Sequence, residues 1–176
     1  LIAVAAGAGG HAGQLSPLAL IGEIIEWFNG PLLLSGAIST GQSVLAAQAM
    51  GADLAYIGTP FIATEEANAV DGYKQMIAQS SADDIVYSSL FTGVHGNYLK
   101  PSIANAGMDP DNLPQSDPSA MDFSDKRNRP KSWKDIWGAG QGIGAIKELV
   151  STQKLVDQLH QEYKRALETL WAKVNG

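Results

Sequence analysis

Three short apolar runs open the chain, and each ends at or just before a glycine. They are LIAVAA (1–6), PLLLS (31–35) and DLAYIG (53–58). A continuous apolar run bounded by turn-forming residues is typical of a strand buried on both faces of a parallel sheet. The pattern therefore predicts three parallel strands.

Each run is followed by a loop and then by apolar residues at helical spacing. Ser16 and Pro17 provide an N-cap and a first-turn proline, and Gly51 provides a helix stop. Glu65 and Glu66 place carboxylates in a predicted first turn, where they complement the helix dipole. The helices are expected at residues 16–28, 42–50 and 65–79. Repeated strand–loop–helix units favour an α/β fold, and periodicity leaves open whether the sheet is a barrel or doubly wound.

The pattern changes after residue 80. Residues 83–90 are compatible with a strand or a helix, whereas residues 91–130 are rich in Gly, Pro, Asn, Asp and Ser. Such a long excursion usually forms a lid or a small accessory subdomain. Residues 137–150 predict a glycine-rich turn and a helix, and residues 152–173 predict an amphipathic helix. Its apolar face is expected to contain Leu155, Leu159, Tyr163, Leu167 and Trp171.

Charge and composition narrow the function classes. The net charge is −6, and no Lys/Arg stripe is present, so the chain lacks the basis for binding nucleic acid. The chain has no cysteine, which excludes disulfides and thiolate metal sites and fits a cytoplasmic location. Its apolar stretches fall short of the roughly 20 residues that span a membrane. Because Leu1 opens directly into a strand, we expect a missing upstream part.

His11 is the first candidate for chemistry. It lies in the loop from Gly7 to Gly13, at the carboxyl end of the first predicted strand, where parallel α/β folds bind their ligands. It is the only side chain of that loop that exchanges a proton near neutral pH. The position alone leaves two roles open, a base or a histidine that bonds only its neighbours.

The next two loops offer a site for a phosphate. Residues 35–41 (SGAISTG) present small side chains and backbone amides before a helix, and Gly58 and Thr59 follow the adjacent strand. Such consecutive loops form the phosphate-binding corner of many (β/α)8 barrels. Neither loop matches GxGxxG or the Walker pattern, so a Rossmann dinucleotide site and a nucleoside triphosphate site are not supported.

The other singled-out residues have structural interpretations. His95 is interpreted as stabilising a turn, and His160 as a surface or packing residue, with no partner at metal-ligand spacing. We therefore expect no metal site. Trp133 and Trp137 are interpreted as anchors in the core or the subdomain. The bare backbone from Trp137 to Gly142 suggests close approach to a ligand or to another chain segment.

Four motifs together resemble the nitronate monooxygenase family, formerly called 2-nitropropane dioxygenases. They are AGAGGHAG (6–13), SGAISTG (35–41), GADLAYIGTPFIAT (51–64) and IWGAGQGIG (136–144). The resemblance implies an FMN cofactor and a catalytic base at His11. It implies that the segment Gly36, Ala37 and Ile38, which is Gly-Gly-Ile in the family, binds the FMN phosphate with the pair Gly58 and Thr59. It also implies that Gly9 and Gly10 border the flavin.

The resemblance further implies the fold. The chain would be the C-terminal part of a (β/α)8 TIM barrel, with about three β/α units, a small accessory subdomain and C-terminal helices. The expected parts are residues 1–80 for the last three units, 81–135 for the accessory or substrate subdomain or lid, and 136–176 for the returning helices. A full barrel needs roughly 250 residues, so the N-terminal remainder of the barrel is an expected partner. A homo-oligomer stays an open alternative.

The resemblance implies FMN-dependent oxidation of alkyl nitronates or nitroalkanes by O2 to a carbonyl compound and nitrite. Two alternatives stay open. One is an NAD(P)H-dependent FMN reductase of quinones or enoyl thioesters, because related FMN barrels share such phosphate loops. The other is a flavin-free barrel for phosphate ligands, or a non-catalytic fragment that binds partners through its exposed edge.

Overall fold

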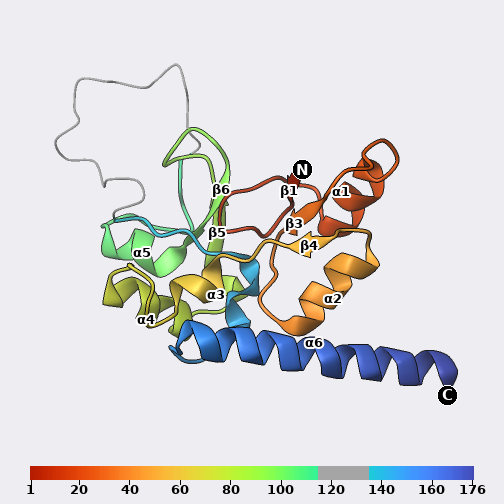
Figure 1. Cartoon of the computed structure of the whole chain (residues 1–176). Coiled ribbons are helices and arrows are strands. Elements are labelled where there is room, and N and C mark those ends of the chain that lie inside the picture. Colours follow the sequence, from red (N-terminus) through yellow and green to blue (C-terminus); the bar gives the residue numbers. More distant parts are fainter. Residues whose placement is uncertain (115–134) are drawn as a thin grey trace.

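The computed structural model describes residues 1–114 and 135–176, and its first half is a partial α/β fold (Figure 1). Three strands form a parallel sheet in the order β1-β3-β4. Their bounds are Ile2–Val4 for β1, Leu33–Ser35 for β3 and Leu54–Ala55 for β4. In the register, Ile2 is opposite Leu33, and Leu33 is opposite Leu54. The three predicted parallel strands are confirmed, although each is shorter than its apolar run.

A helix follows each of these strands. α1 (Pro17–Ile24) follows β1, α2 (Gly41–Ala49) follows β3, and the short α3 (Thr59–Ile62) follows β4. The Ser16 side chain accepts from the Ala19 amide, so the predicted N-cap is confirmed. α1 ends before residue 28 because the amides of Trp27 and Phe28 both donate to the carbonyl of Ile24, which closes the helix in a turn.

The helix expected at residues 65–79 is shorter and begins later, so this prediction was wrong at its start. α4 spans Asp71–Gln79, and Glu65 and Glu66 lie in the loop before it. The Glu65 amide donates to the carbonyl of Val150, which holds the loop out of helical geometry. The Glu66 carboxylate does complement a helix N-terminus, but at Thr152, the first residue of the C-terminal helix. That contact spans 86 residues and has no local signal.

A second, antiparallel sheet has the strand order β2-β6-β5. Its strands are Gly10–His11 for β2, Gly96–Leu99 for β6 and Ile85–Ser88 for β5, and the 3-10 turn η1 (Ala82–Asp84) precedes β5. α5 (Lys100–Asn105) follows β6. The excursion from residue 91 therefore begins with regular structure, which its turn-rich composition did not indicate. Residues 115–134, with Trp133 and the rest of the excursion, lie outside the described residues.

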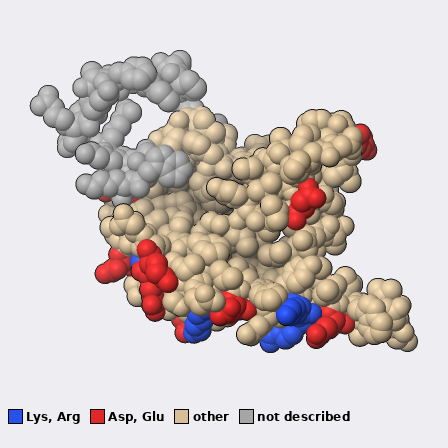
Figure 2. Space-filling view, viewed as in Figure 1, with Lys and Arg blue, Asp and Glu red and all other residues tan. Residues whose placement is uncertain are grey.

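The C-terminal part contains the 3-10 turn η3 (Gln141–Ala145) and the long helix α6 (Thr152–Asn175). α6 runs beneath α2 and continues past it to the C-terminus (Figure 1). Leu155 is buried, whereas Leu167 and Trp171 are 47% and 69% exposed. The predicted apolar face is therefore covered only in the first part of the helix. In Figure 2 the charged side chains gather mainly along the side of α4 and α6, and the far end of α6 shows none.

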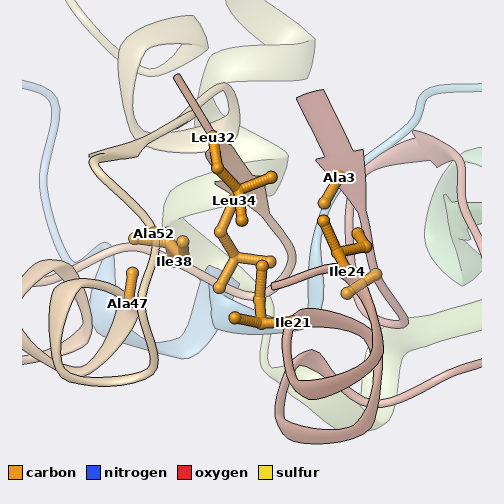
Figure 3. Close-up of a cluster of buried hydrophobic side chains, with 9 residues drawn as sticks. Ala3, Ile21, Ile24, Leu32, Leu34, Ile38, Ala47 and Ala52 are labelled. Carbon is orange, nitrogen blue, oxygen red and sulfur yellow. The ribbon is translucent and has the colours of Figure 1, made fainter. Parts of the chain in front are cut away.

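The main core lies between the parallel sheet and the first two helices (Figure 3). Ile21 and Ile24 of α1 point toward the strands, where Leu34 is 1% exposed. Ala47 of α2 packs into the same cluster. Burying a side chain of the size of Ile or Leu contributes about 1.5–3 kcal/mol each. This core fixes the carboxyl ends of the strands, from which the loops of the candidate site project.

Candidate functional site

The loops after β1, β3 and β4 converge on one cavity of about 330 Å³, which we call the glycine-loop cavity. All seven residues that the sequence assigned to cofactor binding line it, and they come from three separate loops. These residues are Gly9, Gly10, Gly36, Ala37, Ile38, Gly58 and Thr59. The volume lies in the range of small-molecule sites. None of the described residues that line the cavity is charged, so this part of its wall has no carboxylate that would repel an anion.

The turn at Gly36 and Ala37 has an unusual backbone. Ala37 has a φ of +54°, and it is the only residue other than glycine with positive φ in the described part of the chain. Its amide donates to the carbonyl of Gly7 at 3.2 Å, which ties the second loop to the first. Left-handed backbone at a side-chain-bearing residue costs free energy and tends to occur at functional sites. Ala37 occupies the middle position of the segment that is Gly-Gly-Ile in the family that the sequence resembles.

Most amides at the N-terminus of α2, where the sequence suggested an anion site, already have an acceptor in the protein. The Ser43 amide donates to the Thr40 hydroxyl, and the amides of Ser39 and Thr40 donate to the Ser43 hydroxyl. The Gly41 amide donates to the Glu162 carboxylate of α6 at 2.8 Å. The loop's own hydroxyls and a distant carboxylate therefore accept from the amides of Ser39, Thr40, Gly41 and Ser43.

Three other amides at the cavity are available to a ligand. Ile38 lies in the second loop, and Gly58 and Thr59 lie in the third. The described part of the chain gives none of these three N–H groups an acceptor. A side chain at Gly58 would meet no atom within 4 Å, so the space beside this amide is open. Backbone donors from two loops that line a cavity without described charged residues are suited to binding an anion.

The segment from Trp137 to Gly142 also lines the cavity. The Gly140 amide donates to the Thr59 hydroxyl at 3.0 Å, and the Gln141 amide donates to the carbonyl of Gly7 at 2.9 Å. The expected close approach of this bare backbone to another chain segment is confirmed. A side chain at Gly9 would lie 2.8 Å from the Gly140 nitrogen, so Gly9 is small because the chain itself packs there.

An aromatic pair forms one side of the cavity. Tyr73 of α4 stacks on Trp137 with ring centroids 5.0 Å apart, and both residues line the cavity. The Tyr73 hydroxyl donates to the carbonyl of Gly138. Burial raises the pKa of Tyr73 to about 12, so this hydroxyl stays protonated and remains a donor. Trp137 packs against a buried apolar cluster, as expected of an anchor, and it also forms part of the cavity wall.

His11 lies next to the cavity but is not among the residues that line it. It follows Gly10 in β2, pairs with Gly96 of β6 and is exposed. Its Nε2 atom lies 2.9 Å from the Thr92 hydroxyl oxygen. The structure thus brings the seven predicted cofactor residues together in the glycine-loop cavity. His11, the predicted base, lies beside this cavity and does not line it.

The remaining histidines have other surroundings. The His95 ring stacks on Tyr87 at 5.0 Å, and the His95 carbonyl accepts from the Ala12 amide. His160 is exposed on α6. Across residues 1–114 and 135–176, no three His, Asp or Glu side chains are grouped so as to hold a metal ion. No helix in those same ranges is long and apolar enough to cross a bilayer.

Three residues at the site were missed in the sequence. Tyr73 lines the cavity, Asn97 donates from Nδ2 to the carbonyl of Ala8 at 2.7 Å, and Thr92 contacts His11. Asn97 is 1% exposed, and this buried amide fixes the loop that precedes His11. Thr92 and Asn97 lie in the turn-rich excursion, where polar residues are common, so neither carried a signal.

Known proteins match most of the chain. The family model for nitronate monooxygenase matches residues 1–162. A nitronate monooxygenase of Paraburkholderia phytofirmans is 28% identical over 93% of this chain and 48% of that protein. The structure of FabK from Thermotoga maritima has a TM-score of 0.76 at 23% identity, over 98% of this chain and 56% of that one. A nitroalkane oxidase from Streptomyces ansochromogenes has a TM-score of 0.69 at 22% identity, over 96% and 52%.

The two structural likenesses show a shared fold and nothing more, because the sequence identities are only 23% and 22%. The chain spans about half the length of the relatives it matches. The family model, in contrast, covers the glycine loops, His11 and the cavity wall in one continuous match. The chain therefore belongs to the nitronate monooxygenase family, a family of flavin-dependent oxidoreductases.

Proposed function

We propose that this chain provides the FMN phosphate site and the catalytic base of an enzyme that oxidises alkyl nitronates or nitroalkanes with O2. One observation carries the proposal: the seven residues assigned to the cofactor, from three loops, line a single cavity. Three amides without an acceptor in the described chain, an uncharged wall and the adjacent imidazole of His11 add to it. The family match favours this reaction class over others that use similar loops.

In this proposal the chain is the C-terminal part of a (β/α)8 barrel, and the N-terminal remainder completes it. β1 is the end strand of the parallel sheet. On it Ile2 is 50% exposed and Val4 is 39% exposed, which is unusual for the apolar side chains of a parallel strand. A neighbouring strand from the remainder would bury these side chains and pair the open edge.

The residues would hold FMN through its phosphate and its ring. The amides of Ile38, Gly58 and Thr59 would donate to the phosphate, and Gly9 and Gly10 would border the flavin. Bound FMN would supply the electron transfer from the substrate to O2. The protein would supply orientation and proton transfer.

His11 would act as the base. Its imidazole would take the proton from the carbon next to the nitro group, which leaves the electron pair on the nitronate anion. The imidazolium formed in this step would then hold that anion by charge. A substrate supplied already as the nitronate would need no proton removal, so the base is required for only one of the two substrate forms.

The experiment compares His11→Asn with the wild type in the flavin-loaded protein. With the neutral nitroalkane we expect kcat/KM to fall by at least about a hundredfold, because proton transfer by a positioned group contributes 10²–10⁴-fold. With the pre-formed nitronate we expect a change of less than about fivefold. His160→Asn, which alters an exposed histidine of α6, is the control and should match the wild type. Equal losses on both substrates would reject a base at position 11.

A second measurement separates this function from the reductase alternative. The flavin-loaded protein is mixed anaerobically first with nitronate and then, in a separate sample, with NADH, and the flavin absorbance is followed. We expect bleaching by nitronate. Bleaching by NADH alone would favour the quinone or enoyl-thioester reductase, and a purified protein without flavin absorbance would favour a flavin-free phosphate site.

A further inference from the structure

The hairpin of β5 and β6 holds the His11 segment from several sides. β6 pairs with β2, so His11 lies opposite Gly96. The Ala12 amide donates to the carbonyl of His95 at 3.2 Å, and the Tyr87 hydroxyl donates to the carbonyl of Ala12 at 2.8 Å. The backbone on the C-terminal side of the imidazole is therefore fixed by this hairpin rather than by the glycine loop that carries it.

From the turn of this hairpin we infer that Thr92 is a positioning residue, which fixes the orientation and the tautomer of the His11 imidazole. This inference rests on the proposed role of His11 as a base. The Thr92 hydroxyl oxygen lies 2.9 Å from His11 Nε2. No pattern in the sequence pointed to Thr92, and its hydroxyl is a hydrogen-bond partner of this imidazole.

The proton of the Thr92 hydroxyl decides the tautomer. That hydroxyl donates to the carbonyl of Val94 at 3.0 Å, and a hydroxyl has a single proton to give. Its oxygen can then only accept from the imidazole, as it also accepts from the Val94 amide at 3.3 Å. The neutral imidazole therefore carries its proton on Nε2 and its lone pair on Nδ1. A base with one fixed tautomer presents the same nitrogen in every turnover.

Thr92 is itself held in place. The Gly93 amide donates to the carbonyl of Ser89 at 2.8 Å, which closes the turn around residue 92. Thr92 is half-buried, whereas His11 is exposed. Two titratable groups on the same hairpin, Tyr87 and His95, stack on each other, and the Tyr87 hydroxyl donates to a backbone carbonyl. The bond from Thr92 is therefore built into the hairpin geometry.

The first test reads the tautomer directly and needs no flavin. Long-range ¹H–¹⁵N NMR spectra of the chain are recorded at about pH 9, where an ordinary imidazole is neutral. The His11 signals are assigned by their loss in His11→Asn. We expect the wild type and Thr92→Ser to show the Nε2–H form, and Thr92→Val to show a mixture of both forms. An Nδ1–H form in the wild type, or a Thr92→Val spectrum equal to the wild type, would overturn the inference.

The second test measures turnover in the flavin-loaded protein. With the neutral nitroalkane we expect Thr92→Val to lower kcat by about tenfold, because one hydrogen bond of ordinary strength no longer orients the base. With pre-formed nitronate it should leave kcat nearly unchanged, and Thr92→Ser should restore the wild-type value with both substrates. A loss in Thr92→Ser equal to that in Thr92→Val would show that the hydroxyl is not responsible.

The two proposals fail in different ways. If His11→Asn loses activity equally on both substrates, the base role falls, whatever the NMR spectra show. If His11→Asn is selective for the nitroalkane and Thr92→Val behaves as the wild type, only the positioning role of Thr92 falls.

Discussion

The amide of Gly41 donates to the carboxylate of Glu162 at 2.8 Å, and this contact joins α2 to α6 across 121 residues of sequence. The two backbones touch here, since a side chain at Gly41 would lie 2.2 Å from the nitrogen of Tyr163 and 2.3 Å from the carbonyl oxygen of Leu159. The Tyr163 hydroxyl also donates to the side chain of Gln48 at 2.7 Å. α6 therefore fixes the position of α2 and of the loop of residues 35–41 before it.

Replacing Glu162 with alanine should lower the free energy of unfolding by about 1 kcal/mol, because a carboxylate at a helix N-terminus satisfies an otherwise unpaired amide. Urea denaturation measures the change. Glu168→Ala is the matched control on the same helix, and this exposed residue should change stability by less than about 0.5 kcal/mol. Equal effects of the two substitutions would show that the contact with Gly41 contributes nothing.

Glycine at position 37 should make the folded protein more stable than the alanine that is present. Its φ of +54° is unfavourable for a residue with a side chain. We expect Ala37→Gly to raise the free energy of unfolding by about 0.5 kcal/mol, because relief of the backbone strain exceeds the added freedom of the unfolded chain. Ala37→Val should lower it, since a β-branched side chain is disfavoured at positive φ. Thermal unfolding of both variants checks the sign, and a lower midpoint for Ala37→Gly would contradict the strain.

Glu66 should make stability depend on pH in the acidic range. The amide of Thr152, at the start of α6, holds the pKa of Glu66 below its ordinary value of 4.5. A carboxyl group whose folded-state pKa is depressed stabilises the folded protein above the unfolded pKa, and this stabilisation is lost as pH falls through the folded pKa. The wild type should therefore exceed Glu66→Gln in urea midpoint at pH 7, and the difference should shrink below pH 4.5. A difference that is constant with pH would contradict this.

The parallel strands, and the loops that line the cavity at their carboxyl ends, could be predicted because their signals are local. A buried parallel strand needs a continuous apolar run, as in Leu33 and Leu34, and a cofactor loop needs small residues at the strand's end. Both signals can be recognised in a single sequence. The N-cap at Ser16 and its following proline were predicted for the same reason, since a cap acts over only three residues.

The features that were missed depend on contacts between distant segments. The Glu66 carboxylate accepts from the first amide of α6 because Thr64 pairs with Val150, which brings the two segments together. Thr92 reaches His11 because β6 pairs with β2. The sequence suggested free amides at the start of α2, but the Gly41 amide donates to the carboxylate of Glu162 in the last helix. Tertiary pairing decides each of these roles, and no local pattern specifies it.

Two glycines of η3 test whether the cavity wall depends on close backbone packing. A side chain at Gly142 would lie 2.4 Å from the Ser39 hydroxyl oxygen and 2.5 Å from the carbonyl oxygen of Ala37, whereas one at Gly144 would meet no atom within 4 Å. We expect Gly142→Ala to lower the free energy of unfolding by about 1–3 kcal/mol, the usual cost of overpacking. Gly144→Ala should change it little.

The same pair separates packing from cofactor binding. Gly142→Ala would push against the loop that contains Ala37, so it should also weaken FMN binding, measured by fluorescence titration of the flavin. Gly144→Ala should bind FMN as the wild type does, because its methyl group enters open space. If Gly142→Ala unfolds more easily yet binds FMN with unchanged affinity, the loop at Ala37 does not hold the phosphate, and the glycine-loop cavity has another ligand.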